Sequence, residues 1–449
     1  AGDALIGSFT LTGGEKTVLV THWGGDVYPA DVSHSLQMLE HTIFMWRDWA
    51  HHEESVHGEG WAKDYLPLLI RSELVIKMLA HAETGAIAAA PTTSLPEDVG
   101  GVRNWDYRYS WIRDTALSGQ ALVALGHREE AEEFMSWIED VAAGAYQRGA
   151  APQIMYGLHG DTRLDEYRLD HLEGYCGSRP VRVGNAAAGQ FQLETYGELI
   201  AIGYELDRRG HQLSGDVLRF LAATADHICE VWQQPDHGIW EMRGEPKHFV
   251  YSKVMSWHAI GLACRLLDRP EFRRKVTHWR DVRDEIKRTV LARGFNERLN
   301  SFVQAFDSED LDASNLRIAL LEFLPIDDKR IQGTIDAVMR DLSENDLVYR
   351  YRNDDGLPGR EGTFGVCTFW LVDALALSGR VREARHIFER MVSHANHLGL
   401  FSEQIDARTG ALLGNFPQAL THIGHINSAI YLAAAEGKDI PEPAPIGSA

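Results

Sequence analysis

Cysteine is scarce in this chain of 449 residues. Its four cysteines are widely spread, with no CxxC and no short-range pair, and stand at Cys176, Cys229, Cys264 and Cys367. A disulfide framework needs closely spaced pairs, so these residues are expected to be free and mostly buried thiols. Free thiols favour a reducing compartment, and we expect a cytoplasmic location.

Long apolar runs and basic runs are also missing. No stretch reaches the roughly 20 apolar residues that a membrane span needs. The formal net charge is −21, whereas nucleic acids and anionic membranes bind Lys and Arg clusters. These absences exclude both as expected partners and favour a neutral or small polar ligand. The chain opens AGDALIG, without Met or a charged leader, which indicates a processed or trimmed product.

The common signature motifs of several enzyme classes are absent as well. The sequence has no GxGxxG after a strand, no GxxxxGK[ST], no GxSxG and no HExxH. Dinucleotide-binding, P-loop, serine-hydrolase and zincin functions therefore lack their motifs. The composition is nevertheless that of an ordinary globular protein, with 44% hydrophobic and 24% charged residues.

The N-terminal part differs in pattern from the rest. Alternating residues around Gly13 and Gly14 predict a β-hairpin within residues 1–34, and a lone hairpin has to dock on other structure to be stable. Residues 35–60 are expected to form a connecting helix and linker, of which 35–50 is the helix. Residues 61–440 are expected to form the main domain, and 441–449 a tail.

Helical periodicity dominates the main domain. It predicts twelve helices near residues 64–83, 111–125, 128–146, 187–209, 214–232, 250–267, 270–292, 313–323, 329–343, 364–378, 381–395 and 417–435. Short and long connections alternate between them, and every long connection precedes an even-numbered helix. If neighbouring helices are antiparallel, all six long loops lie on one face of the domain.

The two sets of helices also differ in polarity. Odd-numbered segments such as 381–395 carry apolar residues on one side only, whereas even-numbered segments such as 364–377 are apolar or small nearly all round. Six enclosed helices alternating with six half-exposed ones predict an all-α fold, an (α/α)₆ barrel. Its loop-rich face is expected to carry the functional site.

The composition of the long loops suits a sugar. Residues 100–114 read GGVRNWDYRYSWIRD, in which aromatic rings alternate with paired hydrogen-bond donors and acceptors. Sugar C–H faces stack on aromatic rings, and sugar hydroxyls take bidentate hydrogen bonds. A helix-capping loop with packed aromatics is the simpler explanation, but the same composition recurs in other loops.

Two loop carboxylates are candidates for acid/base catalysis. Glu241 directly follows Trp240, and Glu403 lies between Ser402 and Gln404. Desolvation beside an indole favours the neutral form of a carboxyl group, which a general acid requires. A second carboxylate across the pocket could deprotonate water. The sequence HHEESVH, at His51, His52 and His57, could in principle bind zinc, but a solvated polar stretch explains it better.

At these residues the sequence resembles glycoside hydrolase family 15, which contains glucoamylases, glucodextranases and trehalases. The resemblance runs from about residue 88 to 430, and its motifs stand in family order. They are APTTSLPE, GGVRNWDYRYSWIRD, GYCGSRPVRVGNAAAGQFQLETYGEL, GIWEMRGEPKHFVYSKVMSW, LDASNL with FLPIDD, DGLPGREGTFGVCTFWLVDAL and LFSEQIDARTGALLGNFPQALTHIGHIN.

The resemblance implies a fold, a site and a mechanism. It implies an (α/α)₆ barrel, preceded by the remnant of an N-terminal β-sandwich in residues 1–34. Glu241 becomes the general acid and Glu403 the general base. The implied sugar-binding residues are Trp105, Trp111, Arg113, Asp114, Arg182, Trp240, Arg350, Arg360 and Glu361. No cofactor and no metal ion are expected, and the oligomeric state stays open.

The expected reaction is hydrolysis of a terminal α-glucosidic bond with inversion, which releases β-glucose. Inversion requires roughly 6.5 to 9.5 Å between the two carboxyl groups. Glucoamylase-like action on α-glucans is the first expectation, and trehalase action is the second within the family. Because a fold does not fix a function, the same barrel could also serve a non-catalytic sugar-binding protein, or an epimerase that uses loop histidines such as His248 or His422.

Overall fold

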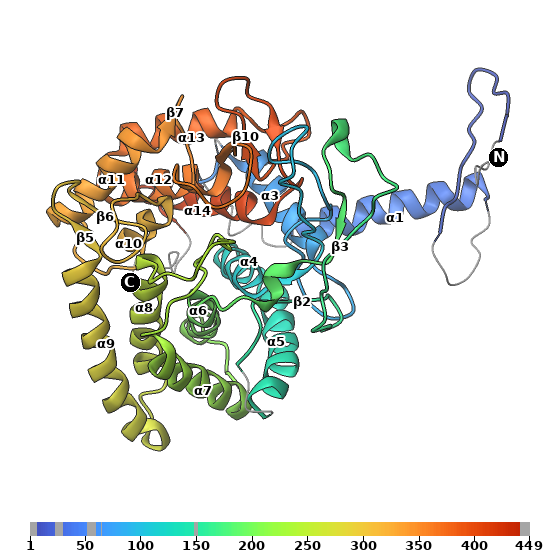
Figure 1. The fold of residues 1–449 in the computed structure, drawn as a ribbon. Helices are drawn as coiled ribbons and strands as arrows, with labels where there is room; N and C mark the ends of the chain where they lie inside the picture. Colours follow the sequence, from blue (N-terminus) through green and yellow to red (C-terminus); the bar gives the residue numbers. More distant parts are fainter. Residues whose placement is uncertain (1–6, 23–29, 52–59, 64, 148–150, 441–449) are drawn as a thin grey trace. The chain divides into compact units, whose positions relative to one another are not determined.

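The computed structural model describes residues 7–22, 30–51, 60–63, 65–147 and 151–440 (Figure 1). The chain divides into two compact units, residues 1–54 and residues 55–449. The boundary lies within the connector that the sequence pattern places at residues 35–60.

The first unit contains one long helix, α1 (Val32–His51). The Asp31 side chain accepts a hydrogen bond from the His34 backbone N–H at 2.7 Å, which explains why the helix begins here. Residues 13–14 form the expected turn, but no strand is formed in the described stretch 7–22. The expected hairpin is therefore present only as a turn, since two strands without a sheet to join are marginal.

The second unit is a double ring of helices. The inner ring consists of α4 (Ile112–Ala124), α6 (Glu194–Arg208), α8 (Val250–Leu266), α10 (Arg317–Leu320), α12 (Gly365–Leu377) and α14 (Ala419–Ala435). The outer ring consists of α3 (Leu66–Leu79), α5 (Glu129–Gln147), α7 (Gly215–Val231), α9 (Arg273–Arg293), α11 (Lys329–Asp341) and α13 (Val381–Val392). Each inner helix contacts the next, and α14 contacts α4, so the ring is closed. The expected (α/α)₆ barrel is confirmed.

Burial separates the two rings as the apolar patterns predict. Every residue of α12 except the last is buried, because the helix is enclosed on all sides. The neighbouring outer helix α13 buries only Ala384, Ile387, Phe388 and Met391, which recur at helical spacing on one side.

Two inner elements are shorter than the periodicity predicts. The expected helix 187–209 begins only at Glu194, because residues 186–189 form a separate 3₁₀ turn (η2, Ala186–Gly189) that Asn185 caps. The expected helix 313–323 consists of a 3₁₀ turn (η4, Ala313–Leu316) followed by α10. Glu322 adopts a φ of 52°, which continues no right-handed helix.

The long connections lie before the inner helices, as expected, and contain short strands. Their pairs are β1 (Ser110–Trp111) with β2 (Met155–Tyr156), β3 (Tyr167–Arg168) with β4 (Arg182–Val183), β5 (Phe295–Asn296) with β6 (Ser301–Phe302), and β7 (Ser343–Glu344) with β8 (Leu347–Val348). A three-stranded sheet joins β9 (Thr363–Phe364), β10 (Gln404–Ile405) and β11 (Leu412–Leu413). Two 3₁₀ turns, η1 (Tyr175–Gly177) and η3 (Pro270–Phe272), complete the described elements.

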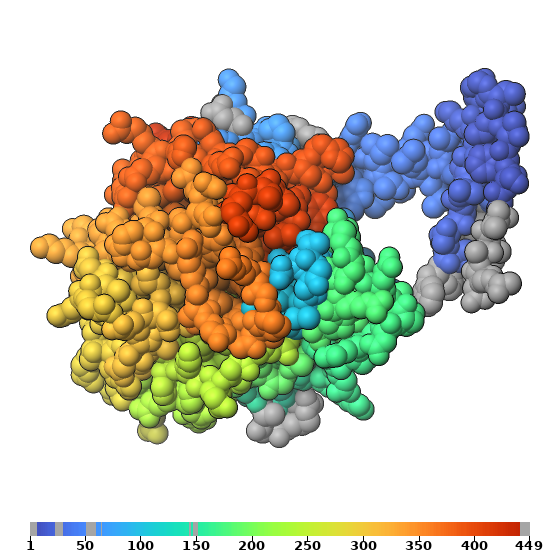
Figure 2. Space-filling view, turned by 45° about the horizontal axis from the view of Figure 1, so that its top comes forward, coloured from blue at the N-terminus to red at the C-terminus, as the bar shows by residue number. Residues whose placement is uncertain are grey.

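These connections meet on one face of the barrel. On the surface drawn in Figure 2, the light blue loop before α4 lies between the green loop before α6 and the orange loop before α12. Hydrogen bonds join the same segments, from Gly100 N–H to Ser178 Oγ at 2.8 Å and from Arg103 Nη1 to Asp355 Oδ2 at 2.7 Å. The loops before α4, α6 and α12 thus form a joined roof on this face of the barrel.

Candidate active site

A cavity lies under this roof. The side chains that line it come from the loops before α4, α6, α8, α12 and α14 and from the starts of α4 and α14. They include Trp105, Tyr107, Trp111, Arg113, Asp114, Asn185, Trp240, Glu241, Arg350, Tyr351, Asp355, Glu361, Glu403 and Gln418.

Glu241 lies on one wall of this cavity. Its backbone adopts a φ of 58°, which is uncommon outside glycine and turns the side chain out of the tight turn that begins at Gly238. Trp111 Nε1–H donates to Glu241 Oε1 at 2.8 Å, and the Glu241 side chain keeps 21% of its surface exposed. Burial raises the pKa of Glu241, although the guanidinium of Arg113 opposes this rise. The raised pKa shifts Glu241 toward its protonated form, and a ligand can still reach its side chain.

Glu403 is buried beside the other wall. Tyr107 O–H donates to its Oε1 at 2.7 Å, whereas its Oε2 has no hydrogen-bond partner in the described part of the chain. Burial raises the pKa of Glu403 to about 7, against the lowering influence of Arg350 and of the Tyr107 hydrogen bond. Oε2 is therefore the carboxyl oxygen of Glu403 that no described group of the chain engages.

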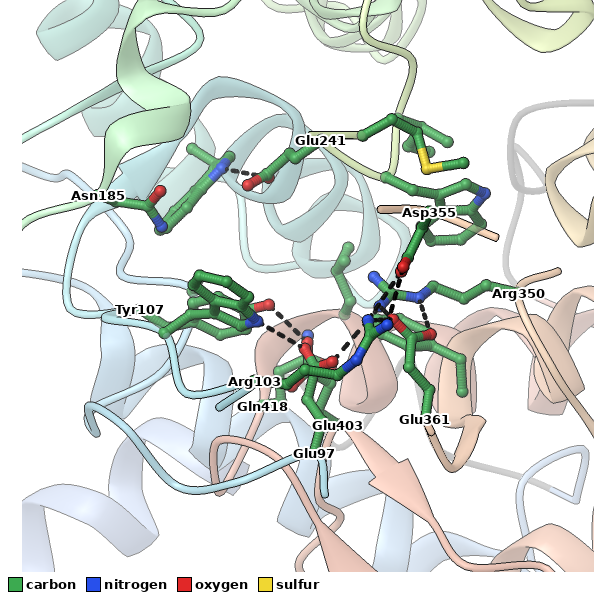
Figure 3. A pocket seen from close by; sticks show the side chains of 18 of the residues that line it. Glu97, Arg103, Tyr107, Asn185, Glu241, Arg350, Asp355, Glu361, Glu403 and Gln418 are labelled. Atoms are coloured by element: carbon green, nitrogen blue, oxygen red, sulfur yellow. Dashed lines mark hydrogen bonds and ion pairs between the residues drawn. The ribbon is translucent and has the colours of Figure 1, made fainter. Parts of the chain in front are cut away.

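The two carboxyl groups belong to one cavity. Figure 3 shows Glu241 and Glu403 on opposite sides of it, with Tyr107 and Arg350 near the latter. They come from loops more than 150 residues apart in the sequence, so only the closed ring of helices can bring them to one place. The sequence-based pair is thus brought together, with open space between its members.

Two residues at the start of α4, Arg113 and Asp114, form the wall beside Glu241. Arg113 Nη2 lies 2.7 Å from Asp114 Oδ2, and Arg113 Nη1 donates to the backbone oxygen of Ile239 at 2.7 Å. The second contact ties α4 to the loop that carries Glu241. Burial raises the pKa of Asp114, while its pairing with Arg113 opposes this rise.

A network of guanidinium and carboxylate groups forms the wall beside Glu403. Glu361 accepts from Arg350 Nε at 3.0 Å and from Arg103 Nη1 at 2.7 Å. Arg103 also donates from both terminal nitrogens to Asp355, at 2.7 and 2.8 Å. Such bidentate pairs are geometrically specific, so they fix the loop before α12 against the loop before α4.

Two tryptophans are held by polar contacts at the cavity edge. Trp240 Nε1–H donates to Asp312 Oδ1 at 2.8 Å, and the Arg350 guanidinium lies 5.5 Å from the Trp240 ring centre. The guanidinium groups of Arg182 and Arg243 each lie 4.8 Å from the centre of the Trp105 ring. These cation–π contacts help to hold the Trp105 ring in one orientation.

The family model that describes glycosyl hydrolases family 15 matches residues 64–430, most of the chain. The chain belongs to glycosyl hydrolases family 15. This family 15 chain is 40% identical to a trehalase of Mycolicibacterium smegmatis, over 97% of this chain and 66% of the relative. It is also 40% identical to a trehalase of Thermoplasma volcanium, over 88% of this chain and 62% of the relative. The chain spans about two thirds of the length of these curated relatives.

Solved structures of lower identity share the fold. A bacterial glucoamylase complexed with acarbose matches with a TM-score of 0.65 and 17% identity, over 84% of this chain and 56% of that chain. A wild-type glycosidase matches with a TM-score of 0.63 and 21% identity, over 82% of this chain and 96% of that chain. At such identities the likeness establishes the barrel architecture of the family 15 chain and nothing finer.

Two of the sugar-binding residues expected from the sequence do not line the cavity. Arg182 is buried behind Trp105 and bonds to Glu166 Oε1 at 2.5 Å. Arg360 is exposed and borders a neighbouring groove, where its backbone N–H donates to Asp98 Oδ2 at 3.4 Å. Glu361, the next residue, borders both the cavity and this groove.

Several cavity residues escaped the sequence-based selection. Tyr107 and Arg103 are part of the aromatic motif 100–114, so the sequence indicated that they could bind a sugar. It did not indicate which side chains they contact. Those partners, Glu403 and Asp355, lie 296 and 252 residues away. Asp355 has no such local signal, because it stands in a polar loop among other acidic residues.

A buried hydrogen-bond chain supports the loop that carries Glu403. The Phe401 N–H donates to His422 Nε2 at 3.1 Å, so the proton of this neutral ring is on Nδ1. His422 Nδ1–H then donates to Ser72 Oγ at 2.9 Å, and the Ser72 hydroxyl donates to His425 Nδ1 at 3.0 Å. Burial lowers the pKa of both histidines, which keeps them neutral.

The loop histidines do not serve as an acid/base pair. His422 is fully buried behind Phe401, and neither His422 nor His248 is among the residues that line the cavity. The ring of His248 stacks on Phe306 instead, with 5.7 Å between ring centres. The histidine-dependent epimerase considered from the sequence therefore lacks its site.

Two further expectations concern a metal and a membrane. The histidine cluster at 51–57 lies outside the part of the chain whose side chains the structure describes. Among the helices in the described ranges, none is long and apolar enough to cross a bilayer.

Proposed function

We propose that this chain is an inverting α-glucoside hydrolase whose substrate is α,α-trehalose, with Glu241 as the general acid and Glu403 as the general base. The pair of carboxyl groups facing one another across a single cavity carries the proposal. Membership of a glycosyl hydrolase family supports the reaction class. The trehalases among the relatives support the choice of substrate over the α-glucans first expected.

In the proposed reaction each carboxyl group has a different task. Protonated Glu241, oriented by Trp111 Nε1–H, gives its proton to the glycosidic oxygen as the C1–O bond breaks. Ionised Glu403 accepts a proton through Oε2 from a water that attacks C1 on the opposite face. For this single displacement we expect the carboxyl groups to be roughly 6.5 to 9.5 Å apart.

The remaining wall residues bind and orient the sugar. Arg113 and Asp114, beside Glu241, offer a donor and an acceptor for hydroxyl groups at the closed end of the cavity. The Arg350 guanidinium and the Tyr107 hydroxyl both favour the ionised form of Glu403. Trp105 and Trp240 are suited to stack on sugar C–H faces.

Trehalose joins two glucose units head to head, so the second glucose also needs polar contacts. The side of the cavity built by the loop before α12 is polar, with Arg350, Tyr351, Asp355 and Glu361. Arg103 forms ion pairs with Asp355 and Glu361 and so fixes the position of this loop. A fixed polar wall favours a disaccharide over a long glucan, which needs an open path for its remaining units.

Product analysis tests the reaction and the substrate together. Inverting hydrolysis of α,α-trehalose gives one β-glucose and, from the leaving group, one α-glucose. We expect proton NMR in the first minutes to show equal amounts of both anomers from trehalose, and slower release from maltose and isomaltose. Two equivalents of α-glucose would refute inversion, and faster hydrolysis of maltose would refute trehalose as the substrate.

Matched variants test the catalytic pair. Glu241→Gln and Glu403→Gln are each expected to lower kcat by a factor of about 10² or more, since general acid and base catalysis contribute about 10²–10⁴ each. Glu245→Gln, on the same loop as Glu241 but exposed, is the control and should retain full activity. Near wild-type turnover in either of the first two variants would refute the role proposed for that residue, whereas no turnover in the wild type would favour a non-catalytic sugar-binding protein.

We also infer the domain limits from this assignment. Residues 61–440 form the catalytic barrel, 35–60 the connector and 441–449 a tail. Residues 1–34 are assigned to the edge of a further β-domain; within the described stretch 7–22, residues 13–14 form a turn. Limited proteolysis followed by mass spectrometry tests these limits, with first cleavage expected in 35–60.

A further inference from the structure

A second cluster of ligand-type side chains lies apart from the catalytic cavity. His81, Glu83 and His159 each offer one ligand atom, and these atoms all lie within 4.8 Å of one another. None of the three lines the catalytic cavity. We propose that this cluster binds a divalent transition-metal ion of the zinc class and thereby joins two loops of the roof.

The fold brings the three residues together from two separate loops. His81 and Glu83 stand in a tight turn after α3, which an isolated bridge between Ala80 and Ile87 closes. His159 stands in the turn 157–160, in the loop before α6. The Thr84 hydroxyl donates to the backbone oxygen of Leu158 at 2.8 Å, so the two turns are already fastened beside one another.

The same hydroxyl determines which nitrogen of His81 can bind an ion. Because Thr84 donates its only hydroxyl proton to the Leu158 carbonyl, it has to accept at its contact with His81 Nδ1, which is 3.0 Å long. His81 Nδ1 therefore carries the ring proton, and the lone pair of Nε2 is left for a metal. Metal-binding histidines are commonly oriented in this way, by a hydrogen bond from their other ring nitrogen.

The spacing is within reach of a metal site. Zinc binds His nitrogen at about 2.0–2.1 Å and carboxylate oxygen at about 2.0–2.2 Å, so tetrahedral ligand atoms are roughly 3.4 Å apart. The distances between the three ligand atoms, which are at most 4.8 Å, therefore have to shorten by at most about 1.4 Å when an ion binds. Glu83 and His159 are exposed and can make this movement by side-chain rotation. The His81 and His159 rings already lie 4.8 Å apart at 80° to one another.

The donor set selects the kind of ion. Two imidazoles with one carboxylate suit Zn²⁺, Cu²⁺, Ni²⁺ or Co²⁺, whereas Mg²⁺ and Ca²⁺ prefer oxygen ligands. Three protein ligands leave positions for water, so the site is accessible rather than closed. The bound ion would cross-link the loop that carries Tyr107 to the loop that carries Asn185, both of which line the cavity.

Cobalt(II) is the probe for the experiment, since its visible absorption bands report ligation directly. The full chain, without a histidine tag and freed of metal by a chelator, is titrated with Co²⁺. We expect one equivalent of Co²⁺ to produce bands that His81→Ala and His159→Ala both abolish. His171→Ala, an exposed histidine on the same loop as His159, is the control and should retain them. Bands that survive in both His81→Ala and His159→Ala would overturn the proposal, as would their absence in the wild type.

Two further measurements separate binding from activity. At a Zn²⁺ concentration of about a hundred times Kd, linkage predicts a rise in Tm of about 3 °C for a barrel of this size, which His159→Ala should lack. Thr84→Val removes the group that orients His81 and is expected to weaken binding by a factor of about 10–100. An unchanged affinity in Thr84→Val would refute the orienting role. Glu241-dependent hydrolysis should be equal in wild type and His159→Ala, so this test is independent of the proposed function.

Discussion

The hydrogen bond between Tyr107 and Glu403 offers the sharpest test of the proposed mechanism. Tyr107→Phe deletes one hydroxyl group and leaves the ring, whose edge packs on Trp111 with 5.4 Å between ring centres. The hydroxyl donates to Glu403 Oε1 at 2.7 Å and lowers the pKa of this carboxyl group. Burial raises the pKa of Tyr107 well above its ordinary value, so the hydroxyl stays protonated and acts only as a donor. The variant should therefore raise the pKa of Glu403.

The size of the effect follows from the strength of a hydrogen bond to a charged group. Such a bond contributes about 1.5–3 kcal/mol, which corresponds to roughly 1–2 pKa units. From a starting pKa of about 7, the ionised fraction of Glu403 at pH 6 then falls about thirtyfold for a middle value of about 1.5 units. At pH 9 the loss is below about twofold, because both proteins are mostly ionised there. This ratio of wild type to variant does not depend on the pKa of Glu241, which is the same in both.

The assay is kcat/KM for trehalose at half-unit intervals from pH 5.5 to 9. We expect the ratio of wild type to Tyr107→Phe to fall from about thirty at pH 6 to near one at pH 9. Tyr109→Phe, whose hydroxyl bonds to the Gly184 N–H instead, is the matched control and should give a constant ratio. A ratio for Tyr107→Phe that does not change with pH would refute the assignment of Glu403 as a base held ionised by this tyrosine.

Three further predictions concern Glu403 and the groups that support its loop. Gly414→Ala places a Cβ 2.3 Å from Glu403 Oε2 and should lower kcat about a hundredfold in steady-state assays. Gly410→Ala is the control: its φ is also +74°, but the added Cβ is 3.5 Å from the nearest neighbouring atom, so kcat should be nearly unchanged. Glu403→Gln should raise Tm, and by more at pH 8 than at pH 5. The pKa of Glu403 is raised to about 7 in the folded protein, so the folded state loses stability as the pH rises from the pKa of the unfolded chain toward 7. The glutamine variant does not have this loss. An equal gain at both pH values in calorimetry would contradict this sign. Ser72→Ala leaves the His422 Nδ1–H without an acceptor and should cost about 1–3 kcal/mol in denaturant titrations, while Ser72→Thr restores most of it.

Local patterns in the sequence were sufficient for the architecture of the barrel. The contrast between α12, apolar all round, and α13, apolar on one side, is a property of neighbouring residues and needs no knowledge of the fold. The alternation of short and long connections placed the loops on one face in the same way. Local patterns failed where a single backbone conformation intervened, as at Glu322, whose positive φ ends α10 early.

The site was only partly accessible from the sequence, for a different reason. Residues such as Trp111 and Glu241 belong to motifs that the family resemblance identifies. The contacts that determine their chemistry are long-range: Tyr107 to Glu403 spans 296 residues and Arg103 to Asp355 spans 252. No periodicity records such a pairing. Arg360 is the converse case, because it adjoins Glu361 in the motif but borders only the neighbouring groove, whereas Glu361 also lines the cavity.

The contact between α4 and α14, which completes the inner ring, has a consequence for biosynthesis. These helices are neighbours in space, yet α4 ends at Ala124 and α14 begins at Ala419. At about 5–20 residues per second, a ribosome needs roughly 15–60 s to make the intervening chain. During that interval the apolar side of α4 that packs on α14 stays uncovered. The segment that carries Glu403 leaves the ribosome only at the end of synthesis. A nascent chain of this protein must therefore stay unassembled for far longer than any single helix takes to form.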